Sequence, residues 1–313
     1  MRAIAVERYG GREQLQLLDI PVPSIGPADV LVEVWAAGVN YVDAMFREGY
    51  YGTNQFPLVM GSDFAGTIVQ LGAEVSDLAV GEEVYGYKLF GNGTYADYVS
   101  VPASYVARKP TNLSFVEAAV LPCVGLTAYE ALERLNLQER ETVLITAAAG
   151  GVGSLAVQIA VDQGARVIAT ASQRNHEYLR HLGVMKVIDY TTEDFVQAIR
   201  AHYPDGIEAV LTCVGGETKQ HSPQVLRDGG RLVWITGDEQ AGPPMERFIQ
   251  GAYQGGMPDR RVLEALAHLA EAKQLSVWID GVFPLEQAAL AQERVETGHI
   301  RGKLVVQVKR EEV

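Results

Sequence analysis

The chain has few cysteines, no long apolar segment and no excess of positive charge. Of its 313 residues only Cys123 and Cys213 are cysteines, and both lie in apolar surroundings. This fits a reducing cytoplasm without a disulfide framework. No apolar run reaches the ~20 residues that a membrane helix needs, and the opening segment MRAIAV is too short for a signal peptide. We therefore expect a cytoplasmic protein with no membrane partner.

Basic residues are outnumbered by acidic ones, 26 to 39, which gives a formal net charge of −13. The sequence thus lacks the basic field that attracts nucleic acid or an anionic membrane. Low-complexity segments and internal repeats are also missing. The length allows two domains, and the hydrophobic content of 48% supports sizeable cores.

The most informative segment is the glycine-rich turn near residue 150. It follows the apolar run 142–146 (TVLIT), which is typical of a buried parallel strand, and leads into a segment with helical apolar spacing. Turns of this kind also occur for packing reasons. Between a strand and a helix, however, the missing side chains let the backbone N–H groups approach a pyrophosphate. The predicted phosphate site consists of Ala149, Gly150, Gly151, Val152 and Gly153.

The segments around this turn predict an α/β fold with two kinds of domain. After the turn, apolar runs at 166–171, 186–189, 208–213 and 230–236 alternate with helical stretches, which indicates a parallel, doubly wound Rossmann sheet. A ligand is then expected at the carboxyl ends of the strands. Residues 1–110 carry short β-type runs broken by glycine and proline, which favours an antiparallel, barrel-like domain. Residues 303–308 (KLVVQV) predict one further strand.

An ordered series of motifs resembles the zinc-independent, quinone-oxidoreductase branch of the medium-chain dehydrogenase/reductase superfamily. The motifs lie at residues 38–43, 61–66, 81–86, 93–98, 121–129, 213–216 and 298–303. The resemblance implies a β-rich, GroES-like catalytic domain of residues 1–121 plus 283–313, with a Rossmann domain of residues 122–282 inserted in it. It also implies an active site in the cleft between the domains, and a homodimer.

Zinc-binding members of this superfamily have a cysteine where this chain has Asn40, and a histidine where it has Ser62. Cys123 aligns with a third ligand position, but a lone thiol cannot hold a tetrahedral zinc ion. We expect no metal. Without a Lewis acid, the substrate of hydride transfer should already be electrophilic.

The cofactor prediction is NADPH. The second Rossmann strand ends in ATASQRN (169–175), without the carboxylate that grips the ribose hydroxyl in NAD sites. Ser172 and Arg174 can instead hold a 2′-phosphate, the arginine through charge-assisted hydrogen bonds. The alternative for Arg174 is a solvated residue at a helix start. The resemblance adds four cofactor contacts: Tyr190 near the adenosine phosphate, Thr127 at the nicotinamide, Val214 and Lys303.

Hydride transfer to a quinone or to the β-carbon of an enone puts negative charge on the carbonyl oxygen, and a nearby proton donor stabilises it. The resemblance places Asn40 and Tyr51 at the substrate, with Tyr51 matching a proton-donating tyrosine of related enoyl reductases. Tyr50 is the alternative by one residue. A second pocket tyrosine of the family is Met45 here. A further expectation is an apolar wall formed by Tyr41, Tyr85 and Phe90.

The leading hypothesis is an NADPH-dependent reductase of quinones or α,β-unsaturated carbonyls. One alternative is a 2-enoyl thioester reductase, which needs an acyl tunnel and a basic patch; residues 40–60 show no such patch. The other is a catalytically idle NADPH-binding relative with a structural or RNA-binding role. The acidic composition argues against RNA.

Overall fold

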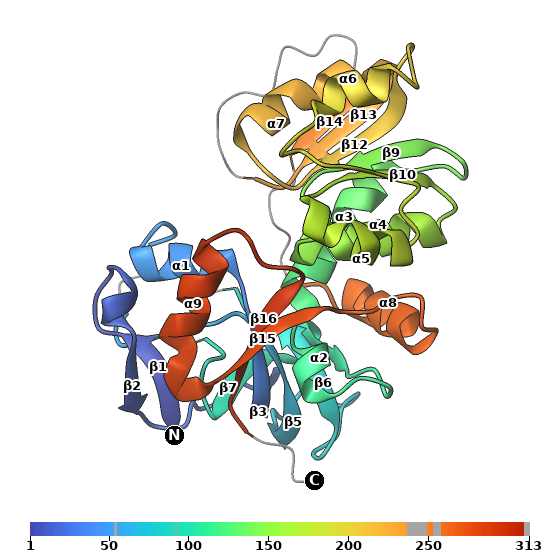
Figure 1. Cartoon of the computed structure of the whole chain (residues 1–313). Coiled ribbons are helices and arrows are strands. Elements are labelled where there is room, and N and C mark those ends of the chain that lie inside the picture. Colours follow the sequence, from blue (N-terminus) through green and yellow to red (C-terminus); the bar gives the residue numbers. More distant parts are fainter. Residues whose placement is uncertain (53–54, 90, 92, 237–248, 253–257, 310–313) are drawn as a thin grey trace. The chain divides into compact units, whose positions relative to one another are not determined.

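The computed structural model describes residues 1–52, 55–89, 91, 93–236, 249–252 and 258–309 (Figure 1). The chain forms two compact units. The first combines Met1–Leu126 with Met257–Val313, and the second is Thr127–Gly256. These limits differ from the expected domain boundaries at 121/122 and 282/283, which stay a prediction. Helix α8 (Arg260–Glu271) belongs to the first unit, where Asn112 Nδ2 donates to the carbonyl of Ala270 at 2.8 Å.

The first unit is built on antiparallel strands. One sheet has the order β15–β16–β3–β5–β6–β8, with β7 also paired to β3, and a smaller sheet has the order β2–β1–β4. Within the described residues β15 and β16 form the parallel pair of this unit. The strands are β1 (Arg2–Val6), β2 (Gln16–Asp19), β3 (Asp29–Val39), β4 (Leu58–Val59), β5 (Asp63–Leu71), β6 (Glu83–Tyr87), β7 (Tyr98–Pro102), β8 (Val106–Arg108), β15 (Ile279–Pro284) and β16 (Lys303–Gln307).

Helices close the first unit around a hydrophobic core that includes Val32, Phe64 and Leu304. They are α1 (Tyr41–Glu48), α2 (Phe115–Ala118), α8 and α9 (Ala288–Glu296). Short 3-10 turns lie between strands β1 and β2 (η1, Arg12–Gln14), between β7 and β8 (η2, Ala103–Tyr105) and before α9 (η5, Leu285–Gln287). Helix α1 ends at Gly49, whose φ of 86° is left-handed and therefore suits glycine.

The second unit is a parallel sheet of order β11–β10–β9–β12–β13–β14. This is the doubly wound Rossmann order, in which the chain reverses direction across the sheet between β9 and β12. The predicted α/β fold, a Rossmann sheet together with a GroES-like β domain, is confirmed. The strands are β9 (Thr142–Ile145), β10 (Arg166–Thr170), β11 (Lys186–Ile188), β12 (Ile207–Thr212), β13 (Leu226–Trp234) and β14 (Ile249–Ala252).

Helices cover both faces of this sheet. Figure 1 shows α4 (Gly151–Asp162) and α5 (His176–His181) on one face, and α6 (Phe195–Arg200) and α7 (Gly216–His221) on the other. Helix α3 (Pro122–Leu135) connects the two units along the chain, and η3 (Gln173–Asn175) and η4 (Ser222–Val225) are short turns. Because both faces are covered, β9 is buried along its whole length and its sequence is uniformly apolar apart from Thr142. Within the described residues, no helix has both the length and the apolar character needed to cross a bilayer.

Candidate functional site

The glycine turn joins the central strand β9 to helix α4, as the sequence predicts. Gly150 is the N-cap and the helix begins at Gly151, so the first backbone N–H groups of α4 lack helical partners. A Cβ on Gly153 would lie 2.5 Å from the carbonyl oxygen of Ala147. Only glycine therefore lets the helix pack this closely on the turn. The open N-terminus at the carboxyl edge of the sheet fits a pyrophosphate.

The ends of β9 and β12 flank the point where the strand order reverses, which is where doubly wound sheets bind ligands. The hydroxyl of Thr146, just after β9, accepts a hydrogen bond from the backbone N–H of Cys213 at 3.0 Å, just after β12. Val214, the next residue, has an exposed side chain. The structure thus brings Val214 and the glycine turn to neighbouring strand ends.

The residues predicted for the adenosine end follow the next two strands. Ser172 and the exposed Arg174 lie in the loop that follows β10, and the exposed Tyr190 lies in the loop that follows β11. The carboxylate closest after β11 is Asp189, which is turned to its own loop: its Oδ1 accepts from the backbone N–H and the hydroxyl of Thr191 at 3.0 and 2.6 Å. The loop that follows β10 therefore contains a serine hydroxyl and the Arg174 guanidinium, without a carboxylate. Thr127 lies within α3 and is half-buried.

In the first unit, Asn40 is the centre of a buried polar group. Its amide Nδ2 donates to Asp63 Oδ2 at 2.8 Å and to Ser62 Oγ at 3.3 Å, and its backbone N–H donates to Asp43 Oδ2 at 2.9 Å. Lys303 Nζ donates to Asn40 Oδ1 and, at 2.8 Å, to the carbonyl of Val39. The Asn40 amide is thus engaged at both ends within the protein. Lys303, predicted to contact the cofactor, contacts this group; its role in cofactor binding stays a prediction.

Two buried carboxylates complete the polar group. Asp43 accepts from Ser62 Oγ at 2.7 Å and from the Tyr95 hydroxyl at 2.8 Å. Burial raises the pKa of Asp43, although its hydrogen bonds oppose this. Burial also raises the pKa of Asp63 to about 6, and the nearby Lys303 ammonium limits the rise. The sequence motif at 61–66 contains Asp63, but only the geometry shows that it faces Asn40 and Lys303.

Tyr51 lies at the edge of this unit, on the loop after α1. Its ring centroid is 4.7 Å from that of Phe46 and 5.1 Å from that of Tyr50, and it is 43% exposed against 66% for Tyr50. Partial burial, with smaller contributions from Tyr50 and Cys123, raises the pKa of Tyr51. Tyr51 is therefore the more enclosed of the two tyrosines.

Cys123 is the second residue of α3 and lies beside Asp63. Its backbone N–H donates to Asp63 Oδ1 at 2.8 Å. Burial, followed by the charge of Asp63, raises the pKa of the Cys123 thiol well above its usual range. The Tyr87 hydroxyl is hydrogen-bonded to the same thiol, and burial raises the pKa of Tyr87 as well. Nothing in the sequence pattern had singled out Tyr87, because its place depends on β6 lying next to β5.

An apolar pocket of about 110 Å³ lies in the first unit. One of its walls is Phe46, the residue that also packs on Tyr51. The expected wall of Tyr41, Tyr85 and Phe90 stays a prediction: Tyr41 is 60% exposed, and the buried Tyr85 hydroxyl donates to the Leu263 carbonyl. Phe90 lies outside the described residues. The pocket is lined by Phe46, Gly52, Leu58, Val59, Met60, Gly61, Leu89 and Gly91.

Among the residues that the structure describes, no three His, Cys, Asp or Glu side chains gather in a way that could hold a metal ion. The cation beside Asn40 and Asp63 is the Lys303 ammonium, 3.6 Å from Asp63 Oδ2. The metal-free mechanism stays a prediction.

Comparisons with known proteins agree with this architecture. Residues 26–111 match the alcohol dehydrogenase GroES-like domain, and residues 182–306 match a family described as zinc-binding dehydrogenase. The chloroplastic NADPH-dependent alkenal/one oxidoreductase of Arabidopsis thaliana is 36% identical, covering 98% of this chain and 79% of the relative.

Two solved structures extend the likeness to the whole fold. The quinone oxidoreductase from Coxiella burnetii superimposes with a TM-score of 0.90 at 34% identity over 99% of both chains. The quinone oxidoreductase of Escherichia coli complexed with NADPH has a TM-score of 0.88 at 25% identity, covering 98% of this chain and 100% of the other. Fold, site and similarity together define a dinucleotide-dependent dehydrogenase or reductase. The chain belongs to the medium-chain dehydrogenase/reductase superfamily, in its quinone-oxidoreductase-like branch.

Proposed function

We propose that this protein is an NADPH-dependent oxidoreductase that reduces quinones or α,β-unsaturated carbonyls. The observation that carries the proposal is the glycine turn at the start of α4, where a Cβ on Gly153 would collide with the backbone at Ala147. Support comes from the Arabidopsis relative, whose name gives NADPH as its cofactor and alkenals or alkenones as its substrates, and from the two quinone oxidoreductase structures.

The residues present fit the proposed cofactor. The backbone N–H groups of residues 149–153 would hold the pyrophosphate, and Ser172, Arg174 and Tyr190 would hold the 2′-phosphate and adenosine end. Thr127 and Val214 would contact the nicotinamide. NADPH, when bound, supplies the hydride.

The first unit supplies groups suited to the substrate. A carbonyl oxygen that gains negative charge needs a hydrogen-bond donor, and we propose the hydroxyl of the half-exposed Tyr51 as that donor. The apolar pocket beside Phe46 would hold an uncharged part of the substrate. In our proposal Asn40 acts within the buried polar group rather than as a donor to substrate, since both ends of its amide are already bonded.

The pocket also supports our proposal that the enzyme reduces small electrophiles, and it argues against the alternative of a 2-enoyl thioester reductase. Its lining contains no charged side chain and its volume is about 110 Å³, so it suits a short apolar group better than a long acyl chain. An idle NADPH-binding relative with a structural or RNA-binding role remains the alternative outcome of the test below.

We further propose that the enzyme works in the cytoplasm as a homodimer and without nucleic acid or membrane partners. The net charge of −13 supports the lack of nucleic acid and membrane partners, and the two cysteines support a reducing compartment. The homodimer rests on the family resemblance alone. The Arabidopsis relative is chloroplastic, so the compartment differs among relatives.

The test is NADPH consumption by the purified protein with a quinone, a short 2-alkenal and an enoyl-CoA thioester. We expect turnover with the first two and little with the thioester. Preference for the thioester would support the alternative enzyme. Tight NADPH binding without turnover of any of the three would support the idle relative.

A further inference from the structure

Thr170, the last residue of β10, holds the turn between β9 and α4 from the neighbouring strand. Its Oγ1 accepts a hydrogen bond from the backbone N–H of Ala147 at 3.2 Å. Its backbone carbonyl accepts from the N–H of Ala148 at 3.1 Å. Thr170 is only 3% exposed. One buried residue of β10 therefore binds the peptide groups on both sides of Ala147.

Ala147 needs this support because its backbone has a conformation that alanine disfavours. Its φ is 48°, in the left-handed region where a Cβ crowds the following carbonyl oxygen. Glycine is the residue that adopts this conformation without penalty. A non-glycine residue stays in such a conformation only when its surroundings hold it there. The two hydrogen bonds to Thr170 are contacts of this kind.

The conformation of Ala147 also sets where α4 begins. Its carbonyl oxygen accepts from the N–H of Gly150 at 3.0 Å. A Cβ on Gly153 would lie 2.5 Å from the same oxygen, so the start of the helix packs directly on this peptide group. A rotation of the peptide group would therefore displace the first N–H groups of α4. These are the groups that hold the pyrophosphate in our proposal.

We infer that Thr170 is a positioning residue for the cofactor: its hydroxyl keeps Ala147 in the left-handed conformation and so keeps the turn in the form that binds the pyrophosphate. The inference rests on the proposed function. If only a fraction of the molecules has the competent turn, the apparent Kd rises by the inverse of that fraction. NADPH and NADH share the pyrophosphate, so the Thr170 hydroxyl matters equally for both.

The test compares Thr170→Val with Thr170→Ser by fluorescence titration of NADPH and NADH. Valine keeps the branched shape of threonine and removes the acceptor, whereas serine keeps the hydroxyl and loses a methyl group. We expect Thr170→Val to raise the Kd of both cofactors about 10-fold, and Thr170→Ser to stay within about 3-fold of wild type. Melting temperatures should fall by similar amounts, because one variant loses a hydrogen bond and the other a buried methyl group. A general loss of stability would thus weaken binding in both.

Thr142→Val is the matched control. Thr142 is also 3% exposed, but it is the first residue of β9, at the end of that strand away from the turn. The same substitution there should leave the Kd of both cofactors at the wild-type value.

A double variant tests the route through Ala147. Adding Ala147→Gly to Thr170→Val should bring both Kd values back to within about 3-fold of wild type, because glycine adopts the left-handed conformation without the hydroxyl. Ala147→Gly should gain less affinity in the wild-type background, where Thr170 already holds the turn.

Hydrogen exchange gives a readout that does not depend on the cofactor. The amide of Ala147 should exchange faster in Thr170→Val than in wild type or Thr170→Ser, because it has lost its acceptor. Unchanged exchange in Thr170→Val would mean that the hydroxyl does not hold the turn.

The inference would also be overturned by wild-type affinity in Thr170→Val, by an equal loss in Thr170→Ser, by a loss for NADPH alone, or by a double variant as weak as Thr170→Val. If Thr170→Val does not fold, Thr170→Ala replaces it, since alanine differs from serine by the hydroxyl alone. A wild-type protein that binds neither cofactor would instead reject the proposed function, and hydrogen exchange would still test the contact between Thr170 and Ala147.

Discussion

Tyr51 is the residue whose hydroxyl bears most directly on the proposed chemistry. It packs on Phe46 beside the apolar pocket and is the less exposed of two adjacent tyrosines. We predict that Tyr51→Phe lowers enone turnover about 10²-fold, at the lower end of the range for a general acid, because water can partly replace a hydroxyl that is 43% exposed. Quinone turnover should fall less, since the hydroquinone anion is better stabilised.

The matched control is Tyr50→Phe, which removes a hydroxyl from the more exposed neighbour. Steady-state kinetics of both variants with one enone and one quinone would check the assignment. If Tyr50→Phe caused the larger loss, Tyr50 would be the donor. Full enone turnover in both variants would leave water as the proton source.

A substitution of Arg174, also at the scale of a single residue, tests the preference for NADPH over NADH. It follows β10, where NAD-specific sites have an acid, and only NADPH carries a 2′-phosphate for it to bind. Charge-assisted contacts contribute about 1.5–3 kcal/mol. Because Arg174 is exposed, we predict the low end: Arg174→Met weakens NADPH binding about 10-fold and leaves NADH unchanged. Titration of both cofactors measures this, and equal losses would contradict it.

At the scale of elements, the turn between β9 and α4 should tolerate few side chains. The helix begins at Gly151. A valine there would project into the proposed pyrophosphate path without entering the sheet, so we predict that Gly151→Val abolishes NADPH binding while the protein stays folded. Circular dichroism and fluorescence titration together check both parts. Normal cofactor binding by the folded variant would move the phosphate site elsewhere.

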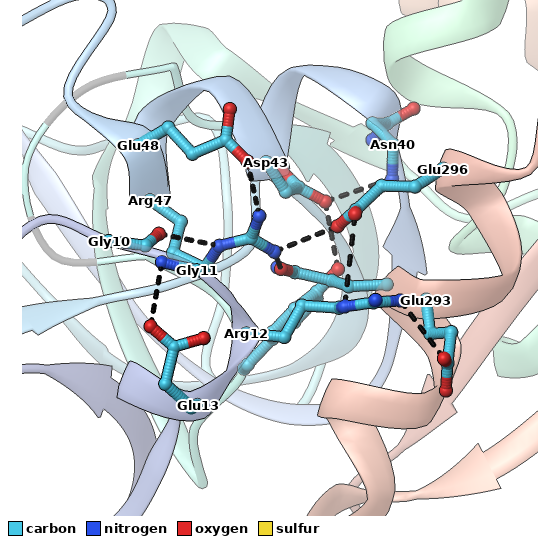
Figure 2. Close-up of polar contacts among 12 residues, drawn as sticks. Gly10, Gly11, Arg12, Glu13, Asn40, Asp43, Arg47, Glu48, Glu293 and Glu296 are labelled. Atoms are coloured by element: carbon cyan, nitrogen blue, oxygen red, sulfur yellow. Dashed lines mark hydrogen bonds and ion pairs between the residues drawn. The ribbon is translucent and has the colours of Figure 1, made fainter.

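Helix α1 is held to α9 by a buried arginine. Arg47 donates to the carbonyl of Gly10 at 3.1 Å and forms ion pairs with Glu48 at 2.6 Å and Glu296 at 2.8 Å. Figure 2 shows these three partners around its guanidinium group. Its Nη1 also donates to the buried Gln292 at 2.5 Å. The side chain is only 1% exposed, so its charge depends on these partners.

We predict that Arg47→Met lowers the free energy of unfolding by about 2–3 kcal/mol. Breaking a fully buried pair costs ~3–5 kcal/mol, and the loss is smaller here because Glu48 and Glu296 can be hydrated. The control is Arg12→Met, which removes a half-exposed partner of Glu293 and Glu296 and should cost under about 1 kcal/mol. Chemical denaturation of the two variants gives the comparison; similar losses would show that burial of Arg47 does not matter.

The whole molecule combines a contiguous Rossmann unit with a β-rich unit assembled from both ends of the chain. Strand β16 pairs with β3 more than 260 residues away, and this pairing carries Lys303 to Asn40.

At the scale of the whole molecule, the prediction concerns its metal content. Asn40 and Ser62 stand where zinc ligands occur in zinc-binding relatives, and a lone Cys123 is too few for a site.

We therefore expect purified, active protein to contain no stoichiometric zinc and to keep its activity after prolonged exposure to a chelator. Elemental analysis and kinetics before and after chelation measure this. One zinc ion per chain, with activity lost on its removal, would reject the metal-free mechanism.

Sequence patterns predicted the confirmed fold because those patterns are local. The turn at 149–153 needs residues without side chains, uniformly apolar runs indicate strands covered on both faces, and proline and glycine interrupt the short strands of the first unit. The lack of an acid after β10 is equally local. Each of these features is decided by residues a few positions apart.

The tertiary structure alone decided how the polar side chains are partnered. The sequence contains Asp63, Arg47 and Lys303 but gives no sign that Arg47 is buried against α9 or that Lys303 meets Asn40, since these contacts join residues about 245 to 263 positions apart. Burial and charge compensation depend on which strands and helices pack together, and local patterns do not specify that. The sequence by itself therefore determined the kind of fold and the phosphate turn, whereas the folded chain determined which buried charges face one another.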